Sequence, residues 1–231
     1  MNKFWKNDDE LFAAAKKELF TAVVGDAMDK MMLLHQFLPP QIQPLKDDMF
    51  LIGRAMPVLE ADTFEELSIG SQNPLMSKPF GLMLEALDDL KKNEVYICSG
   101  ASPNYALLGE LMMTRAKTLG AAGAIANGYS RDTFGMLELD LPIFSYGNYA
   151  QDQGPRGKVI DFRVPIEMNG IRINPGDIIV GDIDGVCVVP KEHEKDVFLR
   201  AFEKARGEKT VLKAIQNGMS ALDAWDKYQI M

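Results

Sequence analysis

Two acidic side chains and one guanidinium are the groups in this sequence best suited by type to do chemistry. Glu110 is followed, after twenty intervening residues, by the adjacent pair Arg131 and Asp132. Arginine can hold a carboxylate through two parallel hydrogen bonds. Aspartate can bind a hard cation such as Mg²⁺ or Mn²⁺, whose other ligands are then mostly water. The three residues suggest a site for a metal and an anionic substrate, although a chain with 33 acidic and 25 basic residues also contains such triples by chance.

The elements around Arg131 and Asp132 are predicted to place them at one end of a parallel sheet. Strands at residues 94–98, 123–126 and 142–146 alternate with helices at residues 105–119 and 131–137, a βαβαβ rhythm typical of a parallel α/β layer. Ligands of open α/β layers bind at the carboxyl ends of the strands, and the Arg-Asp pair follows the second strand closely. The plainer alternative is that Asp132 only caps the next helix and Arg131 lies on the surface.

Gly109 interrupts the helical pattern of residues 105–119. Glycine inside a helix costs stability, so it indicates either the true start of the helix or a close approach of the backbone. If the helix begins there, the amides of Leu111 and Met112 are unpaired donors that could hold a carboxylate. Glu110 falls on the side opposite the apolar stripe, as a residue on a solvated helix face also would.

Ser102 and Asn104 lie in the loop after strand 94–98 and are further candidate substrate contacts. Because serine and asparagine also form turns, a purely local role is an equal alternative. The remaining polar clusters have simpler explanations. His35 and His193 are far apart in sequence and neither has a second ligand nearby, so we assign neither to a metal.

Composition narrows the class of protein. The 231 residues, 47% hydrophobic with a net charge of −8, suit one globular unit and argue against nucleic acid as the main partner. The N-terminal sequence turns acidic too early for a signal peptide, and no apolar run reaches the roughly 20 residues of a membrane helix. We expect a cytoplasmic protein without a membrane partner, in which Cys98 and Cys187 are buried free thiols.

The two ends of the chain are predicted to be helical and the region after Gly157 antiparallel. Helices are expected at residues 11–20, 21–34 and 191–206, with a last helical segment after Gly207 that breaks at Gly218. Between them, short strands punctuated by Asn-Gly, Pro-Gly and Asp-Gly turns indicate a barrel-like antiparallel region.

Several runs of this sequence resemble the RraA-like family. They are LLGEL at residues 107–111, GAAGAIANGYSRD at 120–132, PIF at 142–144, and the segment from Gly176-Asp177 to DIDGVCVVP at 182–190. The family contains class II 4-hydroxy-4-methyl-2-oxoglutarate/4-carboxy-4-hydroxy-2-oxoadipate aldolases and a ribonuclease-activity regulator. The resemblance implies an α/β/β/α sandwich related to swivelling-domain proteins, with N- and C-terminal helices. We expect a single domain over residues 1–231, with a core at about 21–190, a helical extension at 191–231, and assembly as a homotrimer or homohexamer.

The resemblance also implies roles for individual residues. Asp132 would bind Mg²⁺ or Mn²⁺, Arg131 would bind the substrate carboxylate or enolate, and Glu110 would contact the metal through water and transfer protons. Gly109 and the amides of Leu111 and Met112 would hold the substrate carboxylate. Glu208 of a neighbouring subunit is a further candidate for the metal site. Two positions depart from the family pattern, because Glu110 stands where an aspartate is usual and Asn127-Gly128 replaces Asp-Gly.

These roles imply a metal-dependent lyase that cleaves a 4-hydroxy-2-oxo acid by a retro-aldol reaction, or decarboxylates oxaloacetate, through a pyruvate enolate. Two alternatives stay open. One is a non-catalytic regulator of the RraA type, against which Asp132 argues because the regulators lack this aspartate. The other is a lyase or hydratase acting on a sugar acid, for which the departures at Glu110 and Asn127 leave room.

Overall fold

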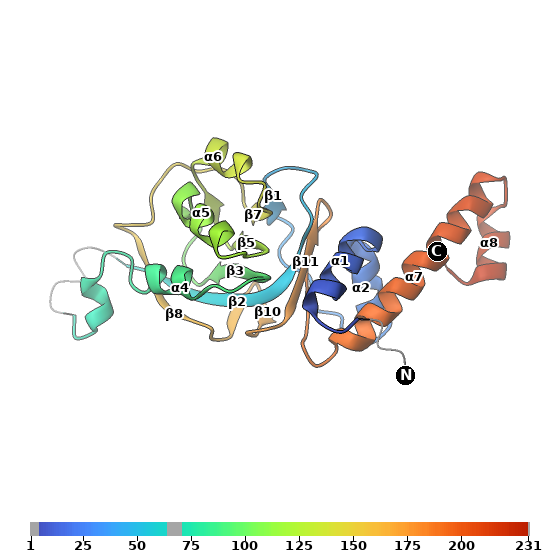
Figure 1. Ribbon diagram of the computed structural model, residues 1–231, viewed down its shortest axis with the longest axis horizontal. Coiled ribbons are helices and arrows are strands. Elements are labelled where there is room, and N and C mark those ends of the chain that lie inside the picture. Colours follow the sequence, from blue (N-terminus) through green and yellow to red (C-terminus); the bar gives the residue numbers. More distant parts are fainter. Residues whose placement is uncertain (1–4, 64–70, 231) are drawn as a thin grey trace.

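A large mixed sheet forms the centre of the molecule, which a computed structural model describes for residues 5–63 and 71–230 (Figure 1). Its strand order is β1-β7-β5-β3-β2-β11-β12, and β8 also pairs with β2. The strands are β1 (Gln43–Pro44), β2 (Leu51–Asp62), β3 (Glu94–Ser99), β4 (Ala106–Leu108), β5 (Gly123–Ala126), β6 (Tyr129–Ser130), β7 (Ile143–Ser145), β8 (Gly157–Phe162), β9 (Ile166–Met168), β10 (Ile171–Ile173), β11 (Ile178–Asp182) and β12 (Gly185–Val189).

The helices lie in two groups on opposite sides of this sheet. Figure 1 shows α4, α5 and α6 over one side and α1, α2 and α7 against the other, with α8 folded back at the far end of α7. No helix within residues 5–63 and 71–230 is long and apolar enough to cross a membrane. The helices are α1 (Asp8–Glu18), α2 (Thr21–Asp29), the short 3₁₀ helix η1 (Pro74–Ser77), α4 (Met83–Asp89), α5 (Glu110–Thr118), α6 (Thr133–Glu138), α7 (Glu194–Gln216) and α8 (Ala221–Tyr228).

The long strand β2 takes part in both predicted kinds of strand pairing, parallel and antiparallel. It runs parallel to β3, which is followed outward by β5 and β7, also in parallel register. Its first half pairs antiparallel with β11 and its second half antiparallel with β8. Both the parallel α/β layer and the antiparallel region after Gly157 are therefore confirmed, as are the buried free thiols of Cys98 and Cys187.

Alternate residues of single strands pack into different apolar layers, which produces the α/β/β/α sandwich. On β3, Tyr96 faces the layer beneath α4 and α5, whereas Ile97 faces the interior of the curved sheet. On β11, Ile179 faces the same interior, and Val180 packs beneath α2 and α7. Because both faces of these strands are buried, their sequences are continuously apolar.

Two predicted boundaries around the site are wrong. The helix predicted at residues 105–119 starts only at Glu110, because Ala106–Leu108 forms the strand β4, paired with β6. The turn predicted at residues 127–130 contains β6 for the same reason. The apolar residues of β4 share the helical spacing of α5, so periodicity alone could not separate them.

Three helix boundaries also differ from prediction. The helix expected at residues 21–34 ends at Asp29, and the short helix expected at 131–137 starts at Thr133. The helix expected to end at Arg206 continues through Gly207 to Gln216. At Gly207 an added Cβ would lie 2.4 Å from Cδ1 of Ile230, so this glycine permits the close return of the C-terminal segment rather than ending the helix.

Arg54 on β2 ties the helices α1 and α7 to the sheet. Its Nε and Nη2 donate to the two carboxylate oxygens of Asp8 at 2.9 and 2.6 Å, and Nη1 pairs with Glu194 at the start of α7. Nη1 also donates to the carbonyl oxygen of Gly176 at 3.1 Å. The Arg54 side chain is only 19% exposed, and its loss would leave the partly exposed carboxylates of Asp8 and Glu194 without their partner.

Arg54→Leu is therefore expected to lower the free energy of unfolding by about 2 kcal/mol, somewhat less than the roughly 3–5 kcal/mol for fully buried pairs. Arg206→Leu is the matched control, because Arg206 makes a similar two-bond pair with Glu18 but is 54% exposed; its cost should stay below about 1 kcal/mol. Urea denaturation of both variants provides the measurement. Equal losses would show that Arg54 does not hold the layers together.

Candidate active site

A two-stranded parallel ladder brings the two halves of the predicted site together. In it, Ala106 of β4 lies opposite Tyr129 of β6, and Leu108 lies opposite Ser130. The amide of Arg131 then donates to the carbonyl oxygen of Leu108 at 2.9 Å. The residues that follow each strand, Gly109 on one side and the Arg-Asp pair on the other, are thereby placed next to one another.

Asp132 points at the start of α5. It occupies the N-cap position of α6 in a left-handed conformation (φ 59°, ψ 36°), yet its side chain makes no capping bond there. Instead, Oδ2 accepts a hydrogen bond from the amide of Glu110 at 3.3 Å. A Cβ on Gly109 would lie 2.9 Å from the same oxygen, so glycine is what allows this approach. Asp132 therefore occupies the N-cap position of α6, as the plainer alternative predicted, but its side chain does not make the capping bond.

Gly109 is the N-cap of α5, which confirms the prediction that it marks the true helix start. Its own backbone is extended (φ −147°, ψ 169°). The amide of Met113 is the one that closes the first helical bond, to the carbonyl oxygen of Gly109 at 3.1 Å. The amides of Leu111 and Met112 precede that bond and have no acceptor within the helix. Donors of this kind, at the positive end of a helix, favour an anion.

Arg131 lies between two carboxylates. Its Nη2 is 3.1 Å from Oδ1 of Asp152, and its Nε is 3.8 Å from Oδ2 of Asp132. Two negative charges and one positive charge leave this cluster with a net charge of −1. The site is half open to solvent, because the side chains of Arg131 and Asp132 are 38% and 46% exposed. A cation therefore finds a favourable potential and room for water ligands here.

No feature of the sequence indicated a role for Asp152 or its neighbour Gln153. Both lie in the irregular segment after β7, where no periodicity indicates a structure. The segment is held in place by the amide of Ala106, which donates to the carbonyl oxygen of Gln151 at 2.8 Å. The same strand β4 that was predicted as helix thus positions this loop, which is why the contact with Arg131 was not foreseen.

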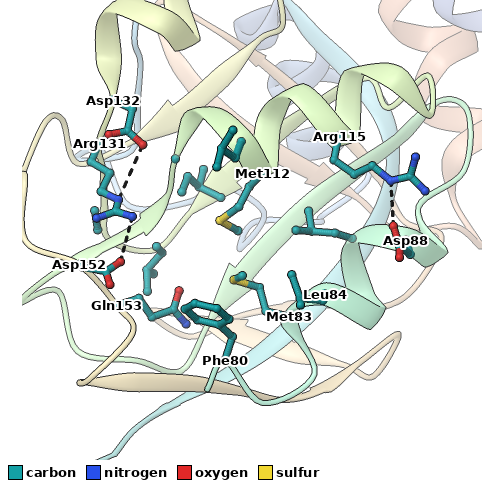
Figure 2. A pocket seen from close by; sticks show the side chains of 16 residues that line it. Phe80, Met83, Leu84, Asp88, Met112, Arg115, Arg131, Asp132, Asp152 and Gln153 are labelled. Carbon is teal, nitrogen blue, oxygen red and sulfur yellow. Dashed lines mark hydrogen bonds and ion pairs between the residues drawn. The ribbon is translucent and has the colours of Figure 1, made fainter. Parts of the chain in front are cut away.

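A hollow of about 420 Å³ opens beside Arg131, between α4 and α5 (Figure 2). Its volume falls within the roughly 300–1,000 Å³ of small-molecule sites. Arg131, Asp132 and Asp152 form one end, and the ion pair of Arg115 with Asp88, 2.8 Å between Nε and Oδ1, forms the other. The wall between them is mainly apolar. Gly109, Leu111 and Met112 line this hollow, as predicted for substrate contacts.

The other predicted site residues lie elsewhere in this chain. The Glu110 carboxylate packs over Gly135, where an added Cβ would be 2.2 Å from its Cδ, and it lines a second hollow that Asp132 also lines. Ser102 and Asn104 line a third hollow beside Asp62. There the amide of Ser102 donates to Asp62 Oδ1 of β2 at 2.9 Å, and Nδ2 of Asn104 donates to Oγ of Ser102 within the loop at 3.1 Å.

Glu208 lies on α7, on the opposite side of the sheet from the site, and pairs with Lys204 at 2.8 Å. Its approach to the site of a neighbouring subunit stays a prediction. Within the described ranges, no three His, Cys, Asp or Glu residues are grouped so that they could hold a metal. The arrangement instead suits a cation bound by one carboxylate, Asp132, with water as its other ligands.

A buried carboxyl group supports the floor of the hollow. Glu60, at the end of β2, is 1% exposed. Its Oε2 accepts a hydrogen bond of 2.6 Å from Nε2 of Gln153, which lines the hollow. Among the described residues, its Oε1 has no hydrogen-bond partner. Burial raises the pKa of Glu60 to about 8, against an ordinary 4.5. The group is therefore mainly neutral at pH 7.

Known proteins match this chain over most of its length. A family model described as "RraA-like: Aldolase/RraA" matches residues 21–188. A protein of Halalkalibacterium halodurans named "Putative 4-hydroxy-4-methyl-2-oxoglutarate aldolase" is 29% identical over 206 residues, which cover 89% of each chain. A solved structure described under "novel cellulases from microbes associated with the gut ecosystem" is 30% identical, with a TM-score of 0.78 and 90% of each chain covered.

A third match concerns the fold alone. Streptomyces coelicolor RraAS2, described as an unusual member of the RNase ES inhibitor RraA protein family, has a TM-score of 0.73 at 20% identity. The match covers 89% of this chain and 98% of that one.

The pKa of Glu60 predicts a pH dependence of stability. Between pH 4.5 and 8 the carboxyl is ionised in the unfolded chain and neutral in the folded one. The contribution of Glu60 to the stability of the folded state is therefore fully present at low pH and is lost as pH rises. From pH 5 to 8 the free energy of unfolding should fall relative to that of Glu60→Gln, with a limiting slope of about 1.4 kcal/mol per pH unit. Urea denaturation at several pH values measures this. Exposed Glu203→Gln controls for loss of one charge, and parallel pH profiles for wild type and Glu60→Gln would contradict the assignment.

Proposed function

The chain belongs to the RraA-like family, and from this premise we propose that it is a divalent-metal-dependent lyase acting on a 2-oxo acid through a pyruvate enolate. The observation that carries the proposal is the placement of Asp132 and Arg131 against the open first turn of α5. The reactions are retro-aldol cleavage of a 4-hydroxy-2-oxo acid and decarboxylation of oxaloacetate. The aldolase names of relatives support this class.

Charge supports a requirement for a cation. The cluster of Arg131, Asp132 and Asp152 has a net charge of −1, which would repel an anionic substrate. A bound Mg²⁺ or Mn²⁺ would change the net charge to +1, and would act as a Lewis acid toward the oxygens of the 2-oxo acid. Asp132 is the residue that would hold it, because its carboxylate is half exposed and faces the hollow.

Substrate binding and proton transfer are then assigned to residues of the chain. The amides of Leu111 and Met112 and the guanidinium of Arg131 bind and orient the substrate carboxylate and the developing enolate. In retro-aldol cleavage the 4-hydroxyl loses its proton, the C3–C4 bond breaks, and C3 keeps the electron pair before it is protonated. Glu110 is the proposed proton carrier. Because its carboxylate lines the second hollow, it would act through intervening water.

Assembly would complete the site. We propose a homotrimer or homohexamer in which Glu208 approaches the metal position from a neighbouring subunit. The competing function, a non-catalytic regulator, is favoured by two exposed apolar side chains beside the site, Leu111 at 85% and Phe134 at 90%. Such residues suit docking to another protein as well as subunit contact.

Asp132→Asn and Arg131→Lys test the proposal. With Mg²⁺ or Mn²⁺ present, the wild type should release pyruvate from oxaloacetate or 4-hydroxy-2-oxopentanoate in a dehydrogenase-coupled assay, and EDTA should abolish this release. Each variant should lose roughly 100-fold or more in rate. Asp132→Asn should also lose metal binding in calorimetry, whereas Arg131→Lys keeps the charge but not the two-bond fork.

Exposed Asp47→Asn is the matched control and should behave as wild type. If Asp132→Asn bound metal as tightly as wild type, Asp132 would not be the metal ligand. If metal-bound wild type released no pyruvate from either compound, the regulator function would be favoured instead.

A further inference from the structure

The substituent that the substrate carries beyond its pyruvyl group has a defined place to bind, the groove between α4 and α5. We propose that this groove binds an uncharged apolar substituent, alkyl or aryl, on C4 of the 4-hydroxy-2-oxo acid. The inference rests on the proposed function and names its substrate class. The substituent would leave as an apolar aldehyde when the C3–C4 bond breaks and the 4-hydroxyl gives up its proton.

The walls of the groove are apolar along its length. Phe80, Met83, Leu84 and Leu87 lie on the α4 side, and Leu111 and Met112 lie on the α5 side (Figure 2). Leu84 is 57% exposed and Leu111 is 85% exposed. Exposed apolar side chains that face one another across a groove gain free energy when an apolar ligand removes them from water. The groove therefore favours an apolar ligand over water.

A second carboxylate would find no partner in this groove. The basic residues of its described lining are Arg131 and Arg115. Arg131 is engaged at the anionic end, and Arg115 is already paired with Asp88 at 2.8 Å. A carboxylate on C4 would thus gain no ion pair beside these leucine and methionine side chains and would lose part of its hydration there. The preference for an uncharged substituent follows from this absence as much as from the apolar walls.

The groove also has a definite length. Arg115 follows Leu111 by four residues on α5, or about 6 Å along the helix axis. The ion pair of Arg115 with Asp88 joins α5 to α4 and closes the groove at that end. The hollow of about 420 Å³ is much larger than a pyruvyl group requires. A substituent of several carbon atoms therefore fits, and a longer one would meet charged groups.

A homologous series tests the proposal. Purified wild type with Mg²⁺ is supplied with 4-hydroxy-2-oxo acids that carry methyl, butyl, hexyl, phenyl or carboxylate at C4, and pyruvate release is followed. For the shorter chains kcat/KM should rise roughly fourfold per methylene, as expected for about 0.8 kcal/mol each, and then level off. The carboxylate compound should be the poorest substrate. Equal or better cleavage of the carboxylate compound would overturn the inference while leaving the proposed function intact.

Leu84→Lys is the diagnostic variant, because its partly exposed position tolerates lysine without disturbing the core. It should remove most of the preference for alkyl compounds and improve cleavage of the carboxylate compound about tenfold or more. Leu34→Lys is the matched control, since Leu34 is similarly exposed, at 53%, but lies outside the groove. An unchanged substrate preference in Leu84→Lys would count against the groove as the binding site.

Binding separates failure of the inference from failure of the proposed function. Calorimetry with Mg²⁺ compares 2-oxooctanoate, pyruvate and 2-oxoglutarate. If no compound yields pyruvate but 2-oxooctanoate binds at least tenfold more tightly than the other two, and Leu84→Lys removes the difference, the groove stands and the lyase function fails. If no pyruvate forms and 2-oxooctanoate binds no better than 2-oxoglutarate, both are overturned.

Discussion

The close approach of Gly109 and Asp132 is the constraint on which the site depends. The parallel pairing of β4 with β6 aligns two segments so that the Asp132 carboxylate, which follows β6, lies against Gly109, which follows β4. A side chain at position 109 would collide with the carboxylate, and Asp132 reaches this position only through a left-handed backbone, which aspartate tolerates better than most residues. The glycine that follows β4 and the aspartate that follows β6 are therefore both needed for this arrangement.

This constraint also determines the electrostatics. Because Asp132 turns toward α5 rather than capping α6, its charge adds to that of Asp152 on either side of Arg131. The two carboxylates fix the direction of the Arg131 side chain, but they also outweigh its positive charge. The cluster as a whole therefore does not attract an anion. The first-turn amides of α5 attract an anion without adding a full charge. A cation bound by Asp132 would change the net charge of the cluster from −1 to +1, as the proposed function requires.

Much of this could be predicted from the sequence, and the main failure at the site has one cause. Repeated short strands and turns indicated both the parallel and the antiparallel halves of the sheet, and a glycine out of place indicated the start of α5. What failed was the segment Ala106–Leu108, whose apolar residues continue the period of the helix that follows. Only its partner strand reveals it as β4, and strand partners are not encoded locally. With β4 missed, neither Asp152 nor Gln153 could be located.

The same error hid the groove. A helix assumed to begin at Tyr105 places the side chains of Leu111 and Met112 on a buried stripe, so that only their amides were predicted to contact a ligand. When the helix begins at Glu110, the buried positions are Met113 and Ala116, and Leu111 is left almost fully exposed. One short helix then presents amides to an anion at its first turn, apolar side chains along its edge, and Arg115 one turn later. Because those three features follow one another on a rigid element, the order of groups along a ligand is fixed by the helix itself.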